Sequence, residues 1–297
     1  MKIRQYQYGP EKTNSYLIME DGHGILIDVP SDKIIGEIDK SGINLDYIIL
    51  THEHADHLWG LNAVREHYAS VVIGQKKCSE YIQDCRKNEA RYYHVYYAMK
   101  YKDKNIGIFD PFYHCGAADI VFEEEYFLQW RDNSIHIFHT LGHSEGSVMI
   151  DVNGNCIFSG DTILKDQGTF TGFHNGSEEE FQKFTKHFID KINVNMRIYP
   201  GHGDSFKFKE WKNGGKTMNR VKYFEVFKAL FEVEESELND SFTFQNVEKW
   251  DSLTHLTLIT DLEDAFDVMF ETDDILHFGG FTNGMKILEK YGVNFTE

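Results

Sequence analysis

The apolar positions in the first two hundred residues fall into short runs, and several of these runs end in a polar turn that carries histidine. In YIILTHEHADH, residues 47–57, an apolar run precedes a cluster of polar residues: His52, Glu53, His54, Asp56 and His57. A short β-rich run bounded by polar residues is typical of a buried strand. Because alternate side chains of an extended chain share one side, residues 52, 54 and 56 are expected to converge. The pattern LWGLNAVREHY then predicts an amphipathic helix over residues 58–68.

Three further apolar runs have the same design. SIHIFHT leads into a turn with His143, NCIFSG leads into Asp161, and MRIYP leads into a turn with His202. Asn153-Gly154, between VMIDV and NCIFS, is a favoured two-residue hairpin turn. Strands that deliver polar residues at their ends are therefore expected throughout this part of the chain.

The pattern becomes helical after residue 217. Phe224, Phe227 and Phe231 recur at helical spacing with Val221, and a loop of about twenty residues follows. A second helix is expected from Ser252, with this apolar face: Leu253, Leu256, Ile259, Leu262, Phe266 and Met269. Its other side is acidic: Asp261, Glu263, Asp264 and Asp267. TDDILHF and FTNGMKILEKYG predict two more helices, the last ending at Gly292. The pattern predicts a small four-helix bundle.

Charge and turn residues place a boundary between these two parts. KEWKNGGKT, residues 209–217, contains Asn-Gly-Gly and three lysines, a composition typical of a flexible joint. Residues 218–297 contain 17 acidic and 6 basic residues, so that segment has a net charge of −11 out of −18 for the whole chain. The predicted organisation is a domain at 1–210, a linker at 211–217 and a second domain at 218–297.

The remaining composition narrows the classes of function. The net charge of −18 argues against a nucleic-acid partner, since a phosphate backbone needs clustered Lys and Arg. The four cysteines form no CxxC pair, so reduced thiols are expected. No apolar run has the length of a signal peptide or a membrane span, so we expect a cytoplasmic protein without a membrane partner.

The polar turns together contain enough ligands for two metal ions. Their five histidines and two aspartates are His52, His54, Asp56, His57, His143, Asp161 and His202. A single tetrahedral zinc takes four ligands, whereas seven nitrogen and oxygen donors can fill two sites if one carboxylate bridges them. Because cysteine is absent from this set, a catalytic site is a better interpretation than a closed structural zinc site.

HxHxDH at 52–57, GHS at 142–144, GDT at 160–162 and PGHG at 200–203 occur in this order, and in them the chain resembles the metallo-β-lactamase fold superfamily. The resemblance is greatest to its glyoxalase II type hydrolases and covers about residues 1–205. It implies an αββα sandwich with the metals at one edge of the sheets. It also implies a ligand set: His52, His54 and His143 for the first metal, Asp56, His57 and His202 for the second, and Asp161 as the bridge. Asp28 would orient a ligand histidine.

The chemistry expected of such a site is hydrolysis of an ester-like bond, because two cations lower the pKa of a bridging water. Asp161 is expected to hold the metals and contact the hydroxide, and Asp56 is expected to orient it and relay a proton. Three residues stay open: Glu53 is either a support of the ligands or a solvated charge, and no role is assigned to His139 or His174.

The segment from about 79 to 130 is rich in aromatic residues and reads as a helical insertion. Its helical stripe consists of Tyr92, Tyr93, Tyr96, Tyr97 and Tyr101. One interpretation is a packed structural insertion, and the other is a cap over the metals that forms an apolar acyl pocket. The two interpretations are compatible.

The second part of the chain contains WDSL, residues 250–253, at the start of a helix. Either Asp251 or Ser252 could cap that helix. The arrangement of helix, long loop, D-S-L, acidic helix and two further helices resembles an acyl or peptidyl carrier protein over residues 218–295. The resemblance implies 4′-phosphopantetheine on Ser252, attached by a phosphopantetheinyl transferase. The helix N-terminus favours its phosphate, and the acidic helix suits docking to acyl-loading or biosynthetic enzymes.

Taken together, the two resemblances predict an α/β hydrolase domain followed by a four-helix carrier domain. The predicted function is a dinuclear zinc thioesterase that releases an acyl group from phosphopantetheine of its own or a partner carrier domain. Iron or a mixed metal pair also fits these ligands. A glutathione thioester is not expected, because the carrier domain occupies the place of the glutathione-binding region of glyoxalase II proteins.

Several alternatives remain open. The fold also suits a di-iron oxygenase that acts on a carrier-bound substrate, or a lactone, lactam or phosphodiester hydrolase with an accessory carrier domain. A non-enzymatic docking scaffold is disfavoured because the full ligand set is intact. The identity of the acyl group and the formation of a homo-oligomer are open as well.

Overall fold

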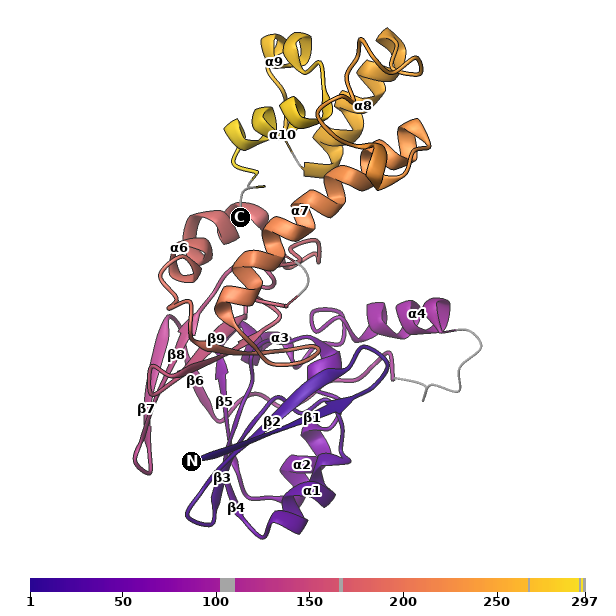
Figure 1. Cartoon of the computed structure of the whole chain (residues 1–297). Helices are drawn as coiled ribbons and strands as arrows, with labels where there is room; N and C mark the ends of the chain where they lie inside the picture. Colours follow the sequence, from indigo (N-terminus) through magenta and orange to yellow (C-terminus); the bar gives the residue numbers. More distant parts are fainter. Residues whose placement is uncertain (102–109, 166–167, 267, 294, 296–297) are drawn as a thin grey trace. The chain divides into compact units, whose positions relative to one another are not determined.

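The computed structural model describes residues 1–101, 110–165, 168–266, 268–293 and 295 (Figure 1). The chain divides into two compact units, Met1–Trp211 and Lys212–Glu297, and each unit is described separately below. No helix in the described part of the chain is both long and apolar enough to cross a membrane.

The described residues of the first unit form two six-stranded sheets. In order across the first sheet lie β1 (Lys2–Tyr8), β2 (Thr13–Glu20), β3 (His23–Ile27), β4 (Asn44–Ile49), β5 (Val71–Gln75) and β6 (Ile120–Phe122). In order across the second lie β12 (Phe206–Lys207), β11 (Arg197–Pro200), β10 (Cys156–Gly160), β9 (Val148–Val152), β8 (Asn133–His139) and β7 (Glu125–Trp130). Both sheets are mixed, because β3 to β6 and the pair β10 and β11 are parallel while their other neighbours are antiparallel.

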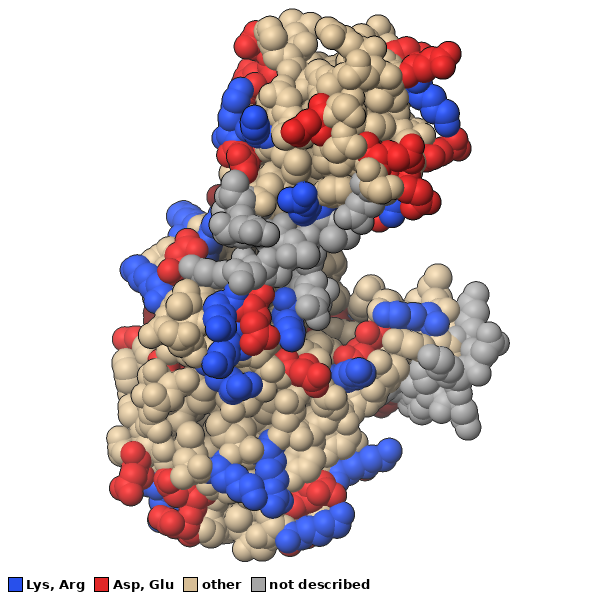
Figure 2. All heavy atoms as spheres, viewed as in Figure 1, with Lys and Arg blue, Asp and Glu red and all other residues tan. Residues whose placement is uncertain are grey.

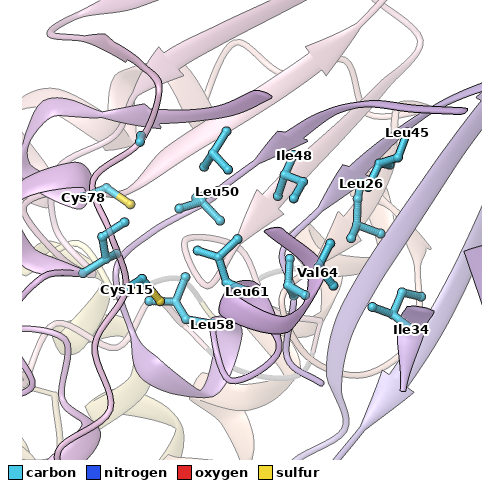
Figure 3. Packing of buried hydrophobic residues seen from close by; sticks show 14 of the residues in the cluster. Leu26, Ile34, Leu45, Ile48, Leu50, Leu58, Leu61, Val64, Cys78 and Cys115 are labelled. Atoms are coloured by element: carbon cyan, nitrogen blue, oxygen red, sulfur yellow. The ribbon is translucent and has the colours of Figure 1, made fainter. Parts of the chain in front are cut away.

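Alternate side chains along each strand point to opposite faces of the first sheet, and both faces are apolar. Ile49 on β4 packs with Ile135 and Ile137 on β8, so one face is buried against the second sheet. Ile48, its neighbour, packs with Leu61 and with the other residues labelled in Figure 3, on the face that the helices cover. These helices are α1 (Ile34–Ser41), α2 (Leu61–His67) and α3 (Lys76–Tyr81).

The second sheet also has a helical cover. Ile157 and Ile198 of this sheet pack with Ile189 of α6 (Lys186–Ile189), which follows α5 (Glu178–Glu180) and the π-helical turn η2 (Phe181–Thr185). The layers of the first unit are therefore helices, sheet, sheet and helices, in the order that the resemblance implied. The predicted α/β class is confirmed.

The segment 79–130 is not a single helical insertion. Helix α4 (Ala90–Lys100) carries the aromatic stripe, but β6 pairs with β5 and β7 pairs with β8. The expected C-terminal limit of the insertion is therefore wrong, because the residues of β6 and β7 belong to the two sheets. Aromatic residues favour strands as readily as they mark a helical stripe, so aromatic content alone did not separate the two. Part of the expected insertion, residues 102–109, lies outside the described residues.

Helices account for most of the second unit. They are α7 (Phe208–Phe231), which begins before residue 212, α8 (Ser252–Phe266), α9 (Thr272–His277) and α10 (Phe281–Lys290), with a short turn η3 (Glu235–Glu237). Tyr223, Phe227, Trp250, Leu258 and Phe278 form the centre of an aromatic core. The expected helical region is present, and its assignment as a carrier domain stays a prediction.

The expected linker differs from the structure. Residues 211–217, expected as a flexible linker, lie within α7. Two glycines cost a helix about 1 kcal/mol each relative to alanine, which weakens the helix without ending it. The side chains of 212–218 and of Val221 are outside those described, as is Asp267.

The apolar face expected for α8 is only partly buried. Leu258, Ile259 and Leu262 are buried, whereas Leu253 is 75% exposed and Leu256 is 57% exposed. At about 100° per residue, Leu253 and Leu256 lie roughly 140° and 200° round the helix from Leu258, so they cannot share its face. Met269, which follows the helix, is 83% exposed and also lies outside the core.

Candidate functional site

The first unit brings together the polar turns that follow four of its strands. The turn after β4 contains His52, His54, Asp56 and His57, and all four side chains are buried. His143 comes from the connection between β8 and β9, Asp161 follows β10, and His202 follows β11. The strand ends thus deliver residues distant in sequence to one buried cluster.

The cluster contains the two sets of side chains that the resemblance implied. Potential ligand atoms of His52, His54 and His143 lie within 4.8 Å of one another, and so do those of Asp56, His57 and His202. Within the first set, Nδ1 of His54 is 3.1 Å from Nε2 of His143, and within the second set, Nε2 of His57 is 3.3 Å from Nε2 of His202.

Asp161 lies between the two sets. Its Oδ2 is 3.7 Å from Nε2 of His143 in the first set and 3.2 Å from Nε2 of His202 in the second. Its Oδ1 is 3.5 Å from Nε2 of His57. A carboxylate in this position can contact a cation in either set.

Asp28, His52 and His57 form a third group whose potential ligand atoms lie within 4.8 Å of one another. However, the Asp28 carboxylate is already occupied by protein donors. Its Oδ1 accepts from the Thr51 amide at 2.8 Å, and its Oδ2 accepts from the Thr51 hydroxyl at 2.6 Å and from Nδ1 of His57 at 2.9 Å. Asp28 therefore orients a candidate ligand, His57, and is not itself free to complete a candidate ligand set.

The residues present fit a bound cation. Among the described residues, four buried atoms of the cluster have no hydrogen-bond partner: Nε2 of His52, Nε2 of His54, Oδ1 of Asp56 and Oδ1 of Asp161. A buried polar atom without a partner is costly, and native proteins satisfy most of them. Imidazole nitrogens and carboxylate oxygens that converge on one buried space are the donors that zinc and iron take.

Backbone carbonyls and the Asp28 carboxylate set the orientation of three histidines that are candidate ligands. Nδ1 of His143 donates to the carbonyl of Phe170 at 2.8 Å, and Nδ1 of His202 donates to the carbonyl of Glu11 at 2.9 Å. With Nδ1 of His57 donating to Asp28, these contacts leave Nε2 of each imidazole directed into the cluster.

The histidines of the cluster fall into two groups, one with a lowered pKa and one with a raised pKa. Burial lowers the pKa of His54 to about 3, with a further contribution from His143, and burial with the neighbouring His57 also lowers the pKa of His52. Burial alone would lower the pKa of His57 too, but Asp56, Asp161 and Asp28 outweigh it and raise that pKa to about 10. Although burial opposes ionisation, the nearby His57 and His202 lower the pKa of Asp56, so this carboxylate is ionised.

Glu53 is buried beside the cluster, which decides a role that the sequence left open. Its carboxylate accepts from the Ser144 hydroxyl at 3.0 Å and from Nδ2 of Asn175 at 2.7 Å, and burial raises its pKa to about 7. Glu53 therefore connects the turn after β4 to the turn that contains His143. Its polar character alone did not distinguish this supporting role from that of a solvated charge.

The two histidines with no assigned role lie outside the ligand sets. Nε2 of His139 contacts the carbonyl of Glu145 at 2.7 Å, and Nδ1 of His174 contacts Oε1 of Glu89 at 2.5 Å. The sequence reasoning also missed Phe173, whose ring centroid is 4.5 Å from that of His54. No spacing signal connected Phe173 to the histidine turns.

Ser252 is the first residue of α8 and is exposed. Oδ1 of Asp251 accepts from the Thr254 amide at 2.8 Å and from the Thr254 hydroxyl at 2.9 Å, so Asp251 caps the helix. In the described part of the chain, no hydrogen bond engages the Ser252 hydroxyl.

Comparison with known proteins connects this geometry to a family. A model of the metallo-beta-lactamase superfamily matches residues 8–202. The hydroxyacylglutathione hydrolase GloC of Haemophilus influenzae is 22% identical over 211 residues, which are 69% of this chain and 92% of that protein. The probable metallo-hydrolase YqgX of Bacillus subtilis is 24% identical over 206 residues, which are 68% of this chain and 90% of that protein.

Solved structures support the same fold. The B3 metallo-beta-lactamase BLEG-1 matches with a TM-score of 0.61 at 22% identity, over 71% of this chain and 97% of that one. ETHE1 from Myxococcus xanthus matches with a TM-score of 0.55 at 19% identity, over 80% of this chain and 94% of that one. The family model ends at residue 202 and does not cover the second unit.

Proposed function

The chain belongs to the metallo-beta-lactamase superfamily, and from this premise we propose that it is a dinuclear metal-dependent thioesterase acting on acyl groups carried by phosphopantetheine. The observation that supports a dinuclear site best is the position of Asp161, within 4 Å of a histidine in each set. His52, His54 and His143 would hold one ion, Asp56, His57 and His202 the other, and Asp161 would bridge them. When bound, such ions polarise a carbonyl and provide hydroxide at neutral pH.

The protein's own groups prepare the site for that chemistry. Oδ2 of Asp56 lies 3.3 Å from Nε2 of His202, whereas its Oδ1 has no partner among the described residues. The unpartnered oxygen is suited to orient the attacking water and to accept its proton. Asp56 is accordingly the proposed base, and Asp161 is the proposed holder of the metals.

A thioester is the substrate class that the relatives favour. GloC and a relative from Pelagibacter ubique, 28% identical over 198 residues, are both named hydroxyacylglutathione hydrolases, and an acyl glutathione is a thioester. We propose that in this chain phosphopantetheine takes the place of glutathione, because the second unit offers its own point of attachment.

That point is Ser252. Its exposed hydroxyl is at the first residue of a 15-residue helix, where the positive end of the helix dipole favours a phosphodiester. Because Asp251 caps the helix, modification of Ser252 breaks no capping hydrogen bond. A phosphopantetheinyl transferase is the proposed modifying partner. A tethered acyl group also has a local concentration on the order of mM for its hydrolase.

Acidic side chains are proposed to steer partners to the second unit. They lie on the face of this unit that is visible in Figure 2, and residues 218–297 have a net charge of −11. Long-range attraction to basic surfaces raises association rates more than affinity. Acyl-loading enzymes with basic docking faces are therefore the proposed partners.

Mass spectrometry of the intact chain tests the whole proposal. The protein is co-expressed with a phosphopantetheinyl transferase, and the wild type is compared with Ser252→Ala. The wild type is expected to gain the mass of one phosphopantetheine, and the variant is not. The arm is then acylated, and release of the acyl group is compared with that in Asp161→Ala. Equal masses of wild type and Ser252→Ala contradict the carrier assignment, and equal acyl lifetimes contradict the hydrolase assignment.

A di-iron oxygenase is the second candidate. One similar solved structure, with a TM-score of 0.56 and 18% identity, is of TTHA1623 in a di-iron-bound form. Histidine and carboxylate ligands suit iron as well as zinc. Metal analysis after anaerobic purification separates the candidates, since stoichiometric iron and oxygen consumption support the oxygenase and two zinc ions support the hydrolase.

A further inference from the structure

We propose that Tyr92, Phe170 and Phe173, the aromatic wall, bind the acyl group of the substrate, that Phe173 determines specificity, and that the preferred acyl group is bulky and apolar. This inference rests on the proposed function and adds the class of acyl group. Octanoyl and phenylacetyl represent the preferred class, and acetyl represents the disfavoured one.

The aromatic wall begins directly at the candidate ligands. The ring centroid of Phe173 is 4.5 Å from that of His54 and 5.6 Å from that of His143. Both histidines belong to the same ligand set, so the wall adjoins one defined side of the site. A substrate carbonyl placed at this set has the Phe173 ring beside its acyl substituent.

Two segments distant in sequence meet in the wall. Phe170 and Phe173 lie between β10 and α5, whereas Tyr92 lies on α4. The Phe173 centroid is 5.1 Å from that of Phe170 and 5.5 Å from that of Tyr92. Both contacts are edge-to-face, a favourable geometry for aromatic rings.

Polar contacts anchor both segments. The Phe170 carbonyl accepts the hydrogen bond of Nδ1 of His143 at 2.8 Å, so the loop that supplies the wall also orients a candidate ligand. His174, next to Phe173, is paired with Glu89 at the start of α4, with Nδ1 and Oε1 2.5 Å apart. These contacts connect the loop of the wall to a candidate ligand on one side and to the start of α4 on the other.

Exposure separates packing from binding along α4. Tyr93 and Tyr97 are 7% and 6% exposed and pack with Ala55 and Ala90, as a structural insertion requires. In contrast, Tyr92 is 46% exposed and Phe170 is 54% exposed, although both rings adjoin Phe173. Large apolar side chains left exposed beside a reactive centre are typical of ligand-binding surfaces. Both interpretations of the aromatic stripe thus apply, each to a different face of α4.

The test compares acyl groups on one leaving thiol. Acetyl, octanoyl and phenylacetyl pantetheine are the substrates of the metal-loaded full chain, with wild type, Phe173→Ala, Phe173→Leu and Phe127→Ala compared. Phe127, on β7, is a matched control because it is 62% exposed and stacks on His136 rather than on a candidate ligand.

The expected result is a loss of selectivity in Phe173→Ala. Its KM for octanoyl and phenylacetyl substrates is expected to rise about tenfold. Its KM for the acetyl substrate and its metal content are expected to stay unchanged. Phe173→Leu, which keeps most of the apolar area, is expected to recover the octanoyl substrate, and Phe127→Ala is expected to match wild type. An equal loss for all three acyl groups, or no loss, overturns the inference.

A binding measurement separates failure of this inference from failure of the proposed function. Calorimetric titration of the metal-loaded protein with octanoate and with acetate is expected to show tighter octanoate binding, weakened about tenfold by Phe173→Ala. If wild type cleaves no thioester but retains this pattern of binding, the proposed function fails and the aromatic wall stands. If thioesters are cleaved and Phe173→Ala binds octanoate as wild type does, the inference about the aromatic wall is wrong and the proposed function is retained.

Discussion

Nδ1 of His57 donates a hydrogen bond to Oδ2 of Asp28 at 2.9 Å, and both side chains are buried. The same carboxylate accepts two hydrogen bonds from Thr51, the residue before the ligand turn. Asp28 thus connects β3, on whose C-terminal side it lies, to the candidate ligands after β4.

Asp28→Asn is expected to weaken metal binding about 10- to 100-fold, because the anionic acceptor that orients His57 and increases its basicity is lost. Competition with a chromogenic chelator measures this affinity. Asp46→Asn is the matched control, since Asp46 also accepts from a histidine, Nδ1 of His23 at 2.8 Å, away from the cluster. Equal metal affinities for wild type and Asp28→Asn contradict the role of Asp28.

Asp161→Ala is expected to lower the bound metal from two ions to one or none and to abolish hydrolysis. The reason is that Asp161 lies within 4 Å of His143 in one ligand set and of His57 and His202 in the other. Elemental analysis of the purified protein gives the stoichiometry. Asp204→Ala, in the same GHGD turn as His202 but exposed, is expected to retain both ions. Retention of two ions by Asp161→Ala argues against a bridge.

Metal removal is expected to destabilise the first unit. Saturation at about 100 times Kd contributes about 2.7 kcal/mol to folding, which corresponds to a fall in Tm of roughly 5–10 °C for a unit of this size on chelation. Differential scanning calorimetry with and without a chelator measures the shift. The transition of the second unit, which has its own aromatic core, is expected to stay constant and serves as the internal reference. A Tm of the first unit that does not respond to the chelator rules out a tightly bound metal.

Glu53→Ala is expected to lower the free energy of unfolding of the first unit by about 1–3 kcal/mol, because it removes the hydrogen bond from Ser144 and leaves the buried Nδ2 of Asn175 without its acceptor. Chemical denaturation monitors the loss. Glu53→Gln retains a side-chain carbonyl acceptor and is expected to lose less. A stability equal to that of wild type in Glu53→Ala shows that Glu53 does not hold the two turns together.

Asp251→Ala is expected to destabilise the second unit by about 1 kcal/mol, whereas Ser252→Ala is expected to change its stability by less than about 0.5 kcal/mol. The two neighbours differ because Asp251, rather than Ser252, accepts from the Thr254 amide. Urea titrations of the second unit's transition measure both effects. A larger loss in Ser252→Ala than in Asp251→Ala reverses the assignment of the cap.

The amino-acid sequence determined the features that depend on neighbours along the chain. The apolar run before His52 predicted β4, and helical spacing from Ser252 predicted the start of α8, because strand and helix periods are set within a few residues. The sequence motifs also identified the histidines and aspartates that the fold brings together in the candidate metal cluster. Their roles as metal ligands, and that of Ser252 as an attachment point, stay predictions.

Only the tertiary structure decided which segments meet. It placed Asp161 between His143 and His202, buried Glu53, brought Phe173 against His54 and turned Leu253 away from the core. It also assigned β6 and β7 to the two sheets, where aromatic content had suggested an insertion. The physical reason is common to all of these: burial and pairing depend on contacts between segments up to a hundred or more residues apart, and local periodicity does not encode the partner.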